Sequence, residues 1–130
     1  PLAKDYGVDV ISMIASTSCQ GIKQIAAEAE GFIYVVSSMG VTGVRAEIET
    51  DIGSMVKVIR EVTDTPAAIG FGISTPAQAK KMAAAADGAI VGSAIVKIIA
   101  RYQDQAREPL MEYVREMKAA VREAENAVCS

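Results

Sequence analysis

The stretch Gly70-Phe71-Gly72-Ile73-Ser74-Thr75-Pro76-Ala77-Gln78 follows a short apolar run at residues 67–70 and marks where a strand gives way to a helix. Thr75 is typical of a helix N-cap, and Pro76 suits the first helical position. Gln78 completes a capping box with Thr75. A buried strand that leads directly into a helix is the repeating unit of a parallel α/β sheet.

The same strand-to-helix order recurs on both sides of this stretch. We expect strands at residues 8–14, 32–37, 67–70 and 89–91, and helices at residues 20–28, 51–62, 76–86, 93–102 and 110–124. A long loop at residues 38–50 follows the second strand. Strict alternation predicts four βα units plus a final helix, with parallel strands and right-handed crossovers. Since no linker divides the chain, we expect one domain over residues 1–130.

Four parallel strands do not close a barrel, because a (βα)8 barrel takes eight. An open arrangement leaves two unpaired strand edges, which proteins avoid. Three architectures remain open at this point. The chain is half of a longer barrel, or two copies close a barrel about a two-fold axis, or the sheet is open and flavodoxin-like.

The composition and charge of the chain argue against two classes of binding partner, nucleic acids and membranes. Of 130 residues, 51% are hydrophobic and 22% are charged, and the net charge is -3. We see no basic stripe, so we expect no nucleic-acid partner. The longest apolar run, residues 88–96, is too short to cross a bilayer, so we expect no membrane partner. Lys4 and Asp5 interrupt any signal-peptide pattern, and Cys19 and Cys129 are expected as free thiols of a cytoplasmic protein.

The chain has no histidine, which excludes Ser-His-Asp and Cys-His catalysis and most transition-metal sites. We therefore expect no metal. No paired carboxylates occur near the end of a strand. Glu47, Glu49 and Asp51 cluster, but in a loop and helix start, where they are expected to be solvated. Asp87 precedes the fourth strand, at the opposite end of the sheet from the glycine-rich turns. The sequence thus offers no convincing general base.

Glycine-rich turns end two consecutive strands, at residues 70–74 and at Gly92-Ser93-Ala94. Glycine lets a backbone approach a ligand closely, and N–H groups at a helix start favour an anion. Two consecutive strands that both end in such a glycine-rich turn predict a phosphate site. The alternative is that these glycines only permit tight turns. Ser93 is either a hydroxyl donor to the anion or an N-cap, and Phe71 either stacks on a ligand or packs.

Two further features fall near the same edge. Tyr34 is central in the second strand, where its hydroxyl either reaches a substrate or is satisfied within a packed core. Gly40-Val41-Thr42-Gly43 follows that strand and is either a mobile lid or an ordinary loop.

Taken together, these motifs closely resemble the tryptophan synthase alpha chain family, in order and in spacing, over nearly the whole chain. The resemblance is carried by Gly31-Phe32-Ile33-Tyr34-Val35-Val36-Ser37, Gly40-Val41-Thr42-Gly43, Gly70-Phe71-Gly72-Ile73-Ser74-Thr75-Pro76 and Gly92-Ser93-Ala94-Ile95-Val96-Lys97. Other phosphate-binding barrels, such as phosphoribosyl-substrate isomerases, share the glycine turns but lack the GVTG segment.

The resemblance implies a (βα)8 barrel of which this chain is the C-terminal half. It implies a lyase that cleaves indole-3-glycerol phosphate to indole and glyceraldehyde 3-phosphate by a retro-aldol route without a cofactor. The indole passes to a beta chain that uses pyridoxal phosphate.

The resemblance also implies roles for individual residues. Gly72, Gly92 and Ser93 would bind the substrate phosphate. The other implied substrate-binding residues would lie beside the phosphate or line the pocket: Phe71, Gly43, Tyr34, Thr42 and Ile14. In this family the catalytic glutamate and aspartate belong to the N-terminal half. We therefore expect no catalytic residue within residues 1–130, and we expect this fragment alone to be inactive.

Overall fold

A computed structural model describes residues 2–15, 18–36, 45–70 and 72–128, and it alternates helices and strands throughout. The elements, in chain order, are α1 (Leu2–Asp5), β1 (Ser12–Ile14), α2 (Cys19–Ala27), β2 (Ile33–Val36), α3 (Arg45–Arg60), β3 (Ala67–Gly70), α4 (Pro76–Ala85), β4 (Gly88–Ala89), α5 (Ser93–Tyr102), the 3-10 turn η1 (Gln103–Gln105) and α6 (Arg107–Val128).

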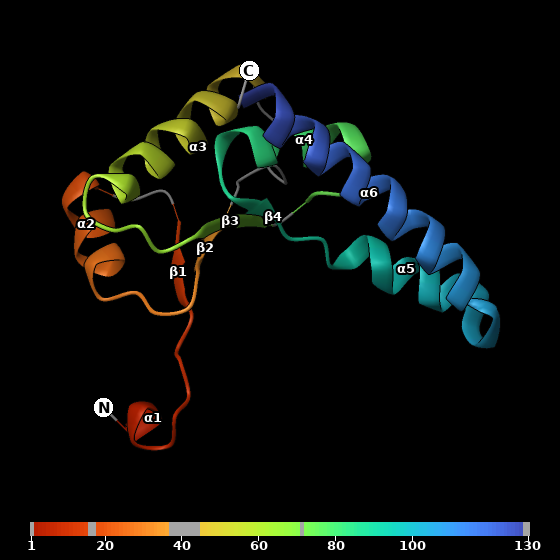
Figure 1. The fold of residues 1–130 in the computed structure, drawn as a ribbon, viewed down its shortest axis with the longest axis horizontal. Coiled ribbons are helices and arrows are strands. Elements are labelled where there is room, and N and C mark those ends of the chain that lie inside the picture. The colour runs from red at the N-terminus through yellow and green to blue at the C-terminus, as the bar shows by residue number, and fades with distance from the viewer. Residues whose placement is uncertain (1, 16–17, 37–44, 71, 129–130) are drawn as a thin grey trace.

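The four strands form one parallel sheet in the order β1-β2-β3-β4 (Figure 1). Ser12 pairs with Ile33, Ile33 with Ala67, and Ala68 with Gly88. Neighbours in space are therefore neighbours in sequence, as in one arc of a barrel. The predicted four βα units and final helix are confirmed.

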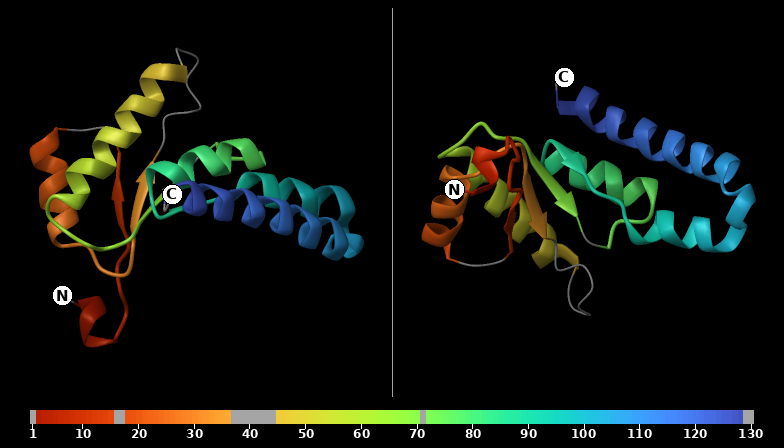
Figure 2. Two further views of the ribbon diagram at one scale, coloured as in Figure 1. Left: turned by 45° about the horizontal axis from the view of Figure 1, so that its top comes forward. Right: turned by 90° about the horizontal axis from the view of Figure 1, so that it is seen from below.

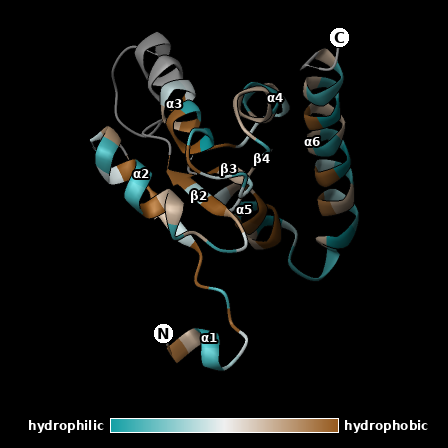
Figure 3. Ribbon diagram, turned by 60° about the vertical axis from the view of Figure 1, so that its left-hand side comes forward, coloured by the Kyte–Doolittle hydropathy of each residue, from teal (hydrophilic) through white to brown (hydrophobic). Residues whose placement is uncertain are grey.

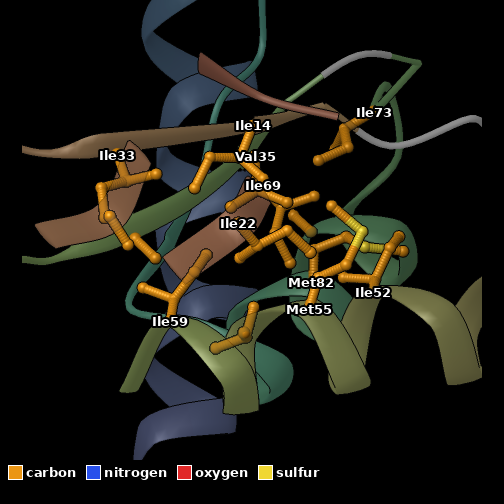
Figure 4. Close-up of a cluster of buried hydrophobic side chains, with 14 of the residues drawn as sticks. Ile14, Ile22, Ile33, Val35, Ile52, Met55, Ile59, Ile69, Ile73 and Met82 are labelled. Atoms are coloured by element: carbon orange, nitrogen blue, oxygen red, sulfur yellow. The ribbon is translucent and has the colours of Figure 1, made fainter. Parts of the chain in front are cut away.

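The sheet has one buried face and one open face, because side chains alternate along each strand. Ile14, Ile33, Val35 and Ile69 share the buried face and are fully buried. Figure 4 shows them meeting side chains of α2, α3 and α4, among them Ile22, Met55 and Met82. Met13, Tyr34, Val36 and Gly70 share the opposite face, where Met13 is 61% exposed.

The helices bury their apolar sides against that core. Ile52, Met55, Val56 and Ile59 of α3 recur at the spacing of one helix face, and all are at most 6% exposed. On the other flank of the sheet, α4 packs along α6, and α5 also contacts α6 (Figure 2). In Figure 3 most of β2 and part of α3 are brown, whereas α6 is mostly teal. Helix α6 therefore forms an outer layer over α4.

The first strand is shorter than predicted. It begins at Ser12, not at residue 8, and Val8 and Val10 are 56% and 63% exposed. Pairing with β2 starts at Ile33, directly after Gly31 turns the chain with a φ of +66°, so earlier residues have no β2 partner alongside them. The short helix α1, which the sequence pattern missed, lies at the end of this extended segment, away from the sheet (Figure 1).

Three other elements have a boundary that differs from the prediction by two residues or more. Helix α3 begins at Arg45, not at 51, because residues 45–49 are mostly strong helix formers that the prediction assigned to a loop. Strand β4 spans Gly88–Ala89 in place of 89–91. Helix α6 starts at Arg107, ahead of the predicted 110, with Pro109 in its first turn, where a missing N–H removes no helical hydrogen bond.

Asp87 has a structural role at the opposite end of the sheet from the glycine-rich turns. Its Oδ2 accepts a hydrogen bond of 2.8 Å from Ala67 N and pairs with the Arg60 guanidinium. Arg60 Nη1 also donates to Thr65 O at 3.1 Å. This cluster joins the end of α3 and the amino-terminal ends of β3 and β4, which agrees with the prediction that Asp87 lies away from the glycine-rich turns.

Candidate phosphate-binding site

The two glycine-rich turns lie at the same edge of the sheet. Ile69 pairs with Ala89, and Ile90 N donates to Ile69 O at 2.7 Å, so β3 and β4 stay side by side up to their carboxyl ends. Gly72 and Gly92 follow within three residues of these pairs, and both are exposed. The structure therefore brings together the two turns that the sequence singled out.

Gly72 has a left-handed backbone, with a φ of +77°. A side chain is disfavoured in this conformation, and glycine adopts it freely. The next residue, Ile73, is 1% exposed and belongs to the core. The turn after β3 thus combines a conformation that needs glycine with a side chain that anchors it.

Helix α5 starts without a side-chain cap. Its N-cap is Gly92, which makes no side-chain cap hydrogen bond, and Val96 N donates back to Gly92 O at 3.2 Å. The N–H groups of Ser93 and Ala94 precede the first intrahelical donor, and Ser93 is exposed. An anion placed here meets two N–H groups, the Ser93 hydroxyl and the positive end of the helix dipole.

Helix α4, by contrast, already uses its N-terminal donors, which corrects the expectation of free N–H groups there. Gln78 Oε1 accepts from Ser74 N at 2.9 Å and from Thr75 N at 3.1 Å. Thr75 Oγ1 accepts from Gln78 N at 3.3 Å, which completes the predicted capping box. Pro76 has no N–H to offer. The N–H groups of Ser74, Thr75 and Gln78 are thus already used, whereas the start of α5 has no side-chain cap.

Tyr34 crosses the open face of the sheet and lies directly over Gly70. A Cβ built on Gly70 would lie 2.7 Å from Tyr34 Cε1, and closer still to its Cζ and hydroxyl oxygen. The approach of the tyrosine ring therefore requires glycine at position 70. The ring of Tyr34 is half-buried and stands on the same face as the end of β3.

The family resemblance implies four further substrate-binding residues, of which the structure describes only Ile14. Ile14 is fully buried in the core, on the face opposite Tyr34, so its role in a pocket wall stays a prediction. Thr42, Gly43 and Phe71 lie outside the described residues.

One residue of the last helix for which no functional role was predicted also reaches this edge. The hydroxyl of Tyr113, on α6, donates to Ser74 O at 2.7 Å. Burial raises the pKa of the Tyr113 phenol, so it remains a donor at neutral pH. A tyrosine within an apolar stripe, with one polar atom to satisfy, is the signal that could have suggested such a contact.

The described residues bear on three other kinds of feature: metal sites, cysteine pairs and membrane-spanning helices. Among them, no group of three or more histidine, cysteine, aspartate or glutamate residues could hold a metal ion. Cys19 is a free, exposed thiol, and Cys129 lies outside the described residues. None of the described helices is long and apolar enough to span a membrane.

Comparison with known proteins decides the family. A family model described as tryptophan synthase alpha chain matches residues 1–128. The chain belongs to this family. The tryptophan synthase alpha chain of Lactiplantibacillus plantarum is 52% identical over 122 residues, and that of Lacticaseibacillus casei is 47% identical over 121 residues. Each match covers 93% of this chain and 46% of the relative, so the chain spans about half the length of these relatives.

Solved structures of the same family share the fold. The tryptophan synthase alpha subunit of Campylobacter jejuni is 35% identical, with a TM-score of 0.71 over 75% of this chain and 40% of that one. A tryptophan synthase structure from Mycobacterium tuberculosis is 31% identical, with a TM-score of 0.74 over 92% of this chain and 44% of that one. The parallel four-stranded sheet thus corresponds to a half-barrel of a tryptophan synthase alpha chain.

Proposed function

We propose that this chain supplies the phosphate-binding half of a lyase that cleaves indole-3-glycerol phosphate to indole and glyceraldehyde 3-phosphate. The observation that carries the proposal is that the exposed, left-handed Gly72 and the uncapped start of α5 follow two paired strands at the same edge of the sheet, in a member of this family. A doubly charged phosphate is the ligand that such an edge favours.

In the proposed complex the phosphate group anchors the substrate by its non-reacting end. The N–H groups of Gly72, Ser93 and Ala94 donate to its oxygens, Ser93 adds its hydroxyl, and Gly92 leaves space for the close approach. Binding energy from this non-reacting end of the substrate holds the reacting carbons in place. Tyr34 lines the pocket on the open face of the sheet, and Phe71, Gly43 and Thr42 complete it as the family resemblance implies. Ile14 lies on the opposite face, so the part that the resemblance implies for it could only be to support this pocket from the core.

The acid and base of the retro-aldol step are proposed to lie outside residues 1–130, on the other half of the barrel. A tryptophan synthase beta chain is the proposed protein partner, and it would receive the indole. The free thiol of Cys19 agrees with a reducing compartment, which supports the cytoplasm as the location.

A titration with inorganic phosphate tests the site. In ¹⁵N-labelled chain, the amide resonances of Gly72, Ser93 and Ala94 should shift saturably, whereas those of Ser74 and Thr75 should shift less because Gln78 already binds their N–H groups. Ser93→Ala removes one donor to a charged ligand and should weaken phosphate affinity about tenfold.

The matched control is Ser12→Ala, at the start of β1, which should bind phosphate like the wild-type chain. Shifts confined to Ser74 and Thr75, or equal affinities of the Ser93→Ala and wild-type chains, would contradict the proposed site.

A second candidate is a phosphate-binding module that pairs with its own copy to close an eight-stranded barrel. Exposed apolar side chains favour it, since Met13 on the edge strand β1 is 61% exposed and Val96, on the helix that follows β4, is 63% exposed. Light scattering should then report twice the mass of one chain. Met13→Lys places a charge on the edge strand β1 and should return the measured mass to that of a monomer. A wild-type chain that stays monomeric at high concentration rules this candidate out.

A further inference from the structure

Tyr113 links the outermost helix to the turn that follows β3. It lies 39 residues beyond Ser74 in sequence, yet its hydroxyl donates to Ser74 O at 2.7 Å. Helix α6 otherwise packs along α4, with Met117 and Ala124 buried at 7% and 2% exposure. The hydroxyl of Tyr113 is therefore the polar end of a helix face that is mainly apolar.

The peptide groups around Ser74 are held from two sides. Ser74 N donates to Gln78 Oε1 at 2.9 Å, and Ser74 O accepts from Tyr113. Gln78 belongs to α4 and Tyr113 to α6, so two different helices fix the same residue. Ser74 stands two positions after Gly72, and the side chain of the intervening Ile73 is locked in the core at 1% exposure.

These contacts limit the motion of Gly72. A glycine with a φ of +77° has a wide choice of conformations, and its N–H can aim at a fixed point only if its neighbours are fixed. A donor that is already aimed pays less ordering cost when an anion binds. The hydroxyl of Tyr113 supplies one of the bonds that fix the neighbours.

We propose that Tyr113 is a positioning residue of the phosphate site, which holds the turn at residues 72–74 so that Gly72 N faces the anion bound at the start of α5. The inference rests on the proposed function, because it needs phosphate to bind at Gly72 and Ser93. It adds a residue from α6 to a site otherwise built from the ends of β3 and β4.

The test is the inorganic phosphate titration applied to Tyr113→Phe, which keeps the ring and removes only the hydroxyl. The variant should bind phosphate about fivefold more weakly, as expected for one lost neutral hydrogen bond. The Gly72 amide should also lose more of its phosphate-induced shift than the Ser93 amide, because only the turn after β3 has been loosened.

Two controls separate positioning from general stability. Tyr102→Phe removes a hydroxyl at the far end of α5, where the ring lies 5.4 Å from the Arg101 guanidinium, and should leave phosphate affinity unchanged. Met117→Ala opens a cavity beside α4 and lowers the melting temperature without touching Ser74, so it too should keep the wild-type affinity.

The outcomes distinguish the two proposals. If the wild-type chain shows no saturable shift at Gly72 or Ser93, the proposed function and this inference both fail. If the wild-type chain binds and Tyr113→Phe binds equally well, or if Met117→Ala weakens binding as much as Tyr113→Phe does, the inference alone fails.

If the Tyr113→Phe variant does not fold, the phosphate titration of the wild-type chain tests the inference instead. The ring resonances of Tyr113 should then shift with the same affinity as the Gly72 amide, while those of Tyr102 stay in place. A Tyr113 ring that does not respond overturns the inference.

Discussion

Replacing Gly70 with alanine is expected to lower the free energy of unfolding by about 1–3 kcal/mol, the usual cost of overpacking. The new Cβ would lie 2.7 Å from Tyr34 Cε1 and closer to the end of the ring. The ring must leave its position over the end of β3, or the strands must move apart. Chemical denaturation of the 130-residue chain measures the loss.

Two matched variants isolate the cause. Gly53→Ala, in an exposed stretch of α3 where a Cβ meets nothing within 4 Å, should stabilise the chain by about 0.5–1 kcal/mol. In the background of Tyr34→Ala, the cost of Gly70→Ala should largely vanish, because the two side chains no longer compete for one space. If the cost persists without the tyrosine, the clash is not its cause.

The second large effect is expected on substrate binding. In a chimera that joins the unmatched half of the Lactiplantibacillus plantarum relative in front of Pro1, Gly72→Val should raise KM for indole-3-glycerol phosphate at least about tenfold. A β-branched residue is a genuine outlier at a φ of +77°, so the turn must change and Gly72 N must move. Steady-state kinetics of indole release provide the measurement.

Gly7 offers a matched control, since its φ is +66° and a Cβ there meets nothing within 4 Å. Gly7→Val should lower stability through the same backbone strain and leave KM unchanged. Equal increases in KM from both variants would show that strain anywhere in the chain, and not the phosphate turn, controls substrate binding.

Local chemistry accounts for the parts of the fold that the sequence predicted well. Strand β3 has the predicted bounds because Pro66 precedes it and Gly70 ends it, and α4 starts as predicted because Thr75, Pro76 and Gln78 form a complete capping box. The core positions of α3 follow from its helical periodicity. Such signals lie within a few residues of each other and need no tertiary information.

Predictions failed where the outcome depended on distant partners. Residues 8–11 are apolar enough for a strand, but pairing with β2 starts only at Ile33. The occupied donors at the start of α4 are a different case, because Gln78 lies within four residues of Ser74 and Thr75 and the predicted capping box already implied its role. The contact from Tyr113 to Ser74 joins residues that no local pattern connects. Adjacency of the two glycine-rich turns was predictable, because consecutive parallel strands end at one edge.

Lyase activity of the chimera tests the central claim most directly. Residues 1–130 joined to the unmatched half of the Lactiplantibacillus plantarum relative should release indole from indole-3-glycerol phosphate, whereas residues 1–130 alone should stay at background, because the family's acid and base are expected on the other half. A chimera that folds and binds phosphate but releases no indole, or release of indole by residues 1–130 alone, would contradict the account.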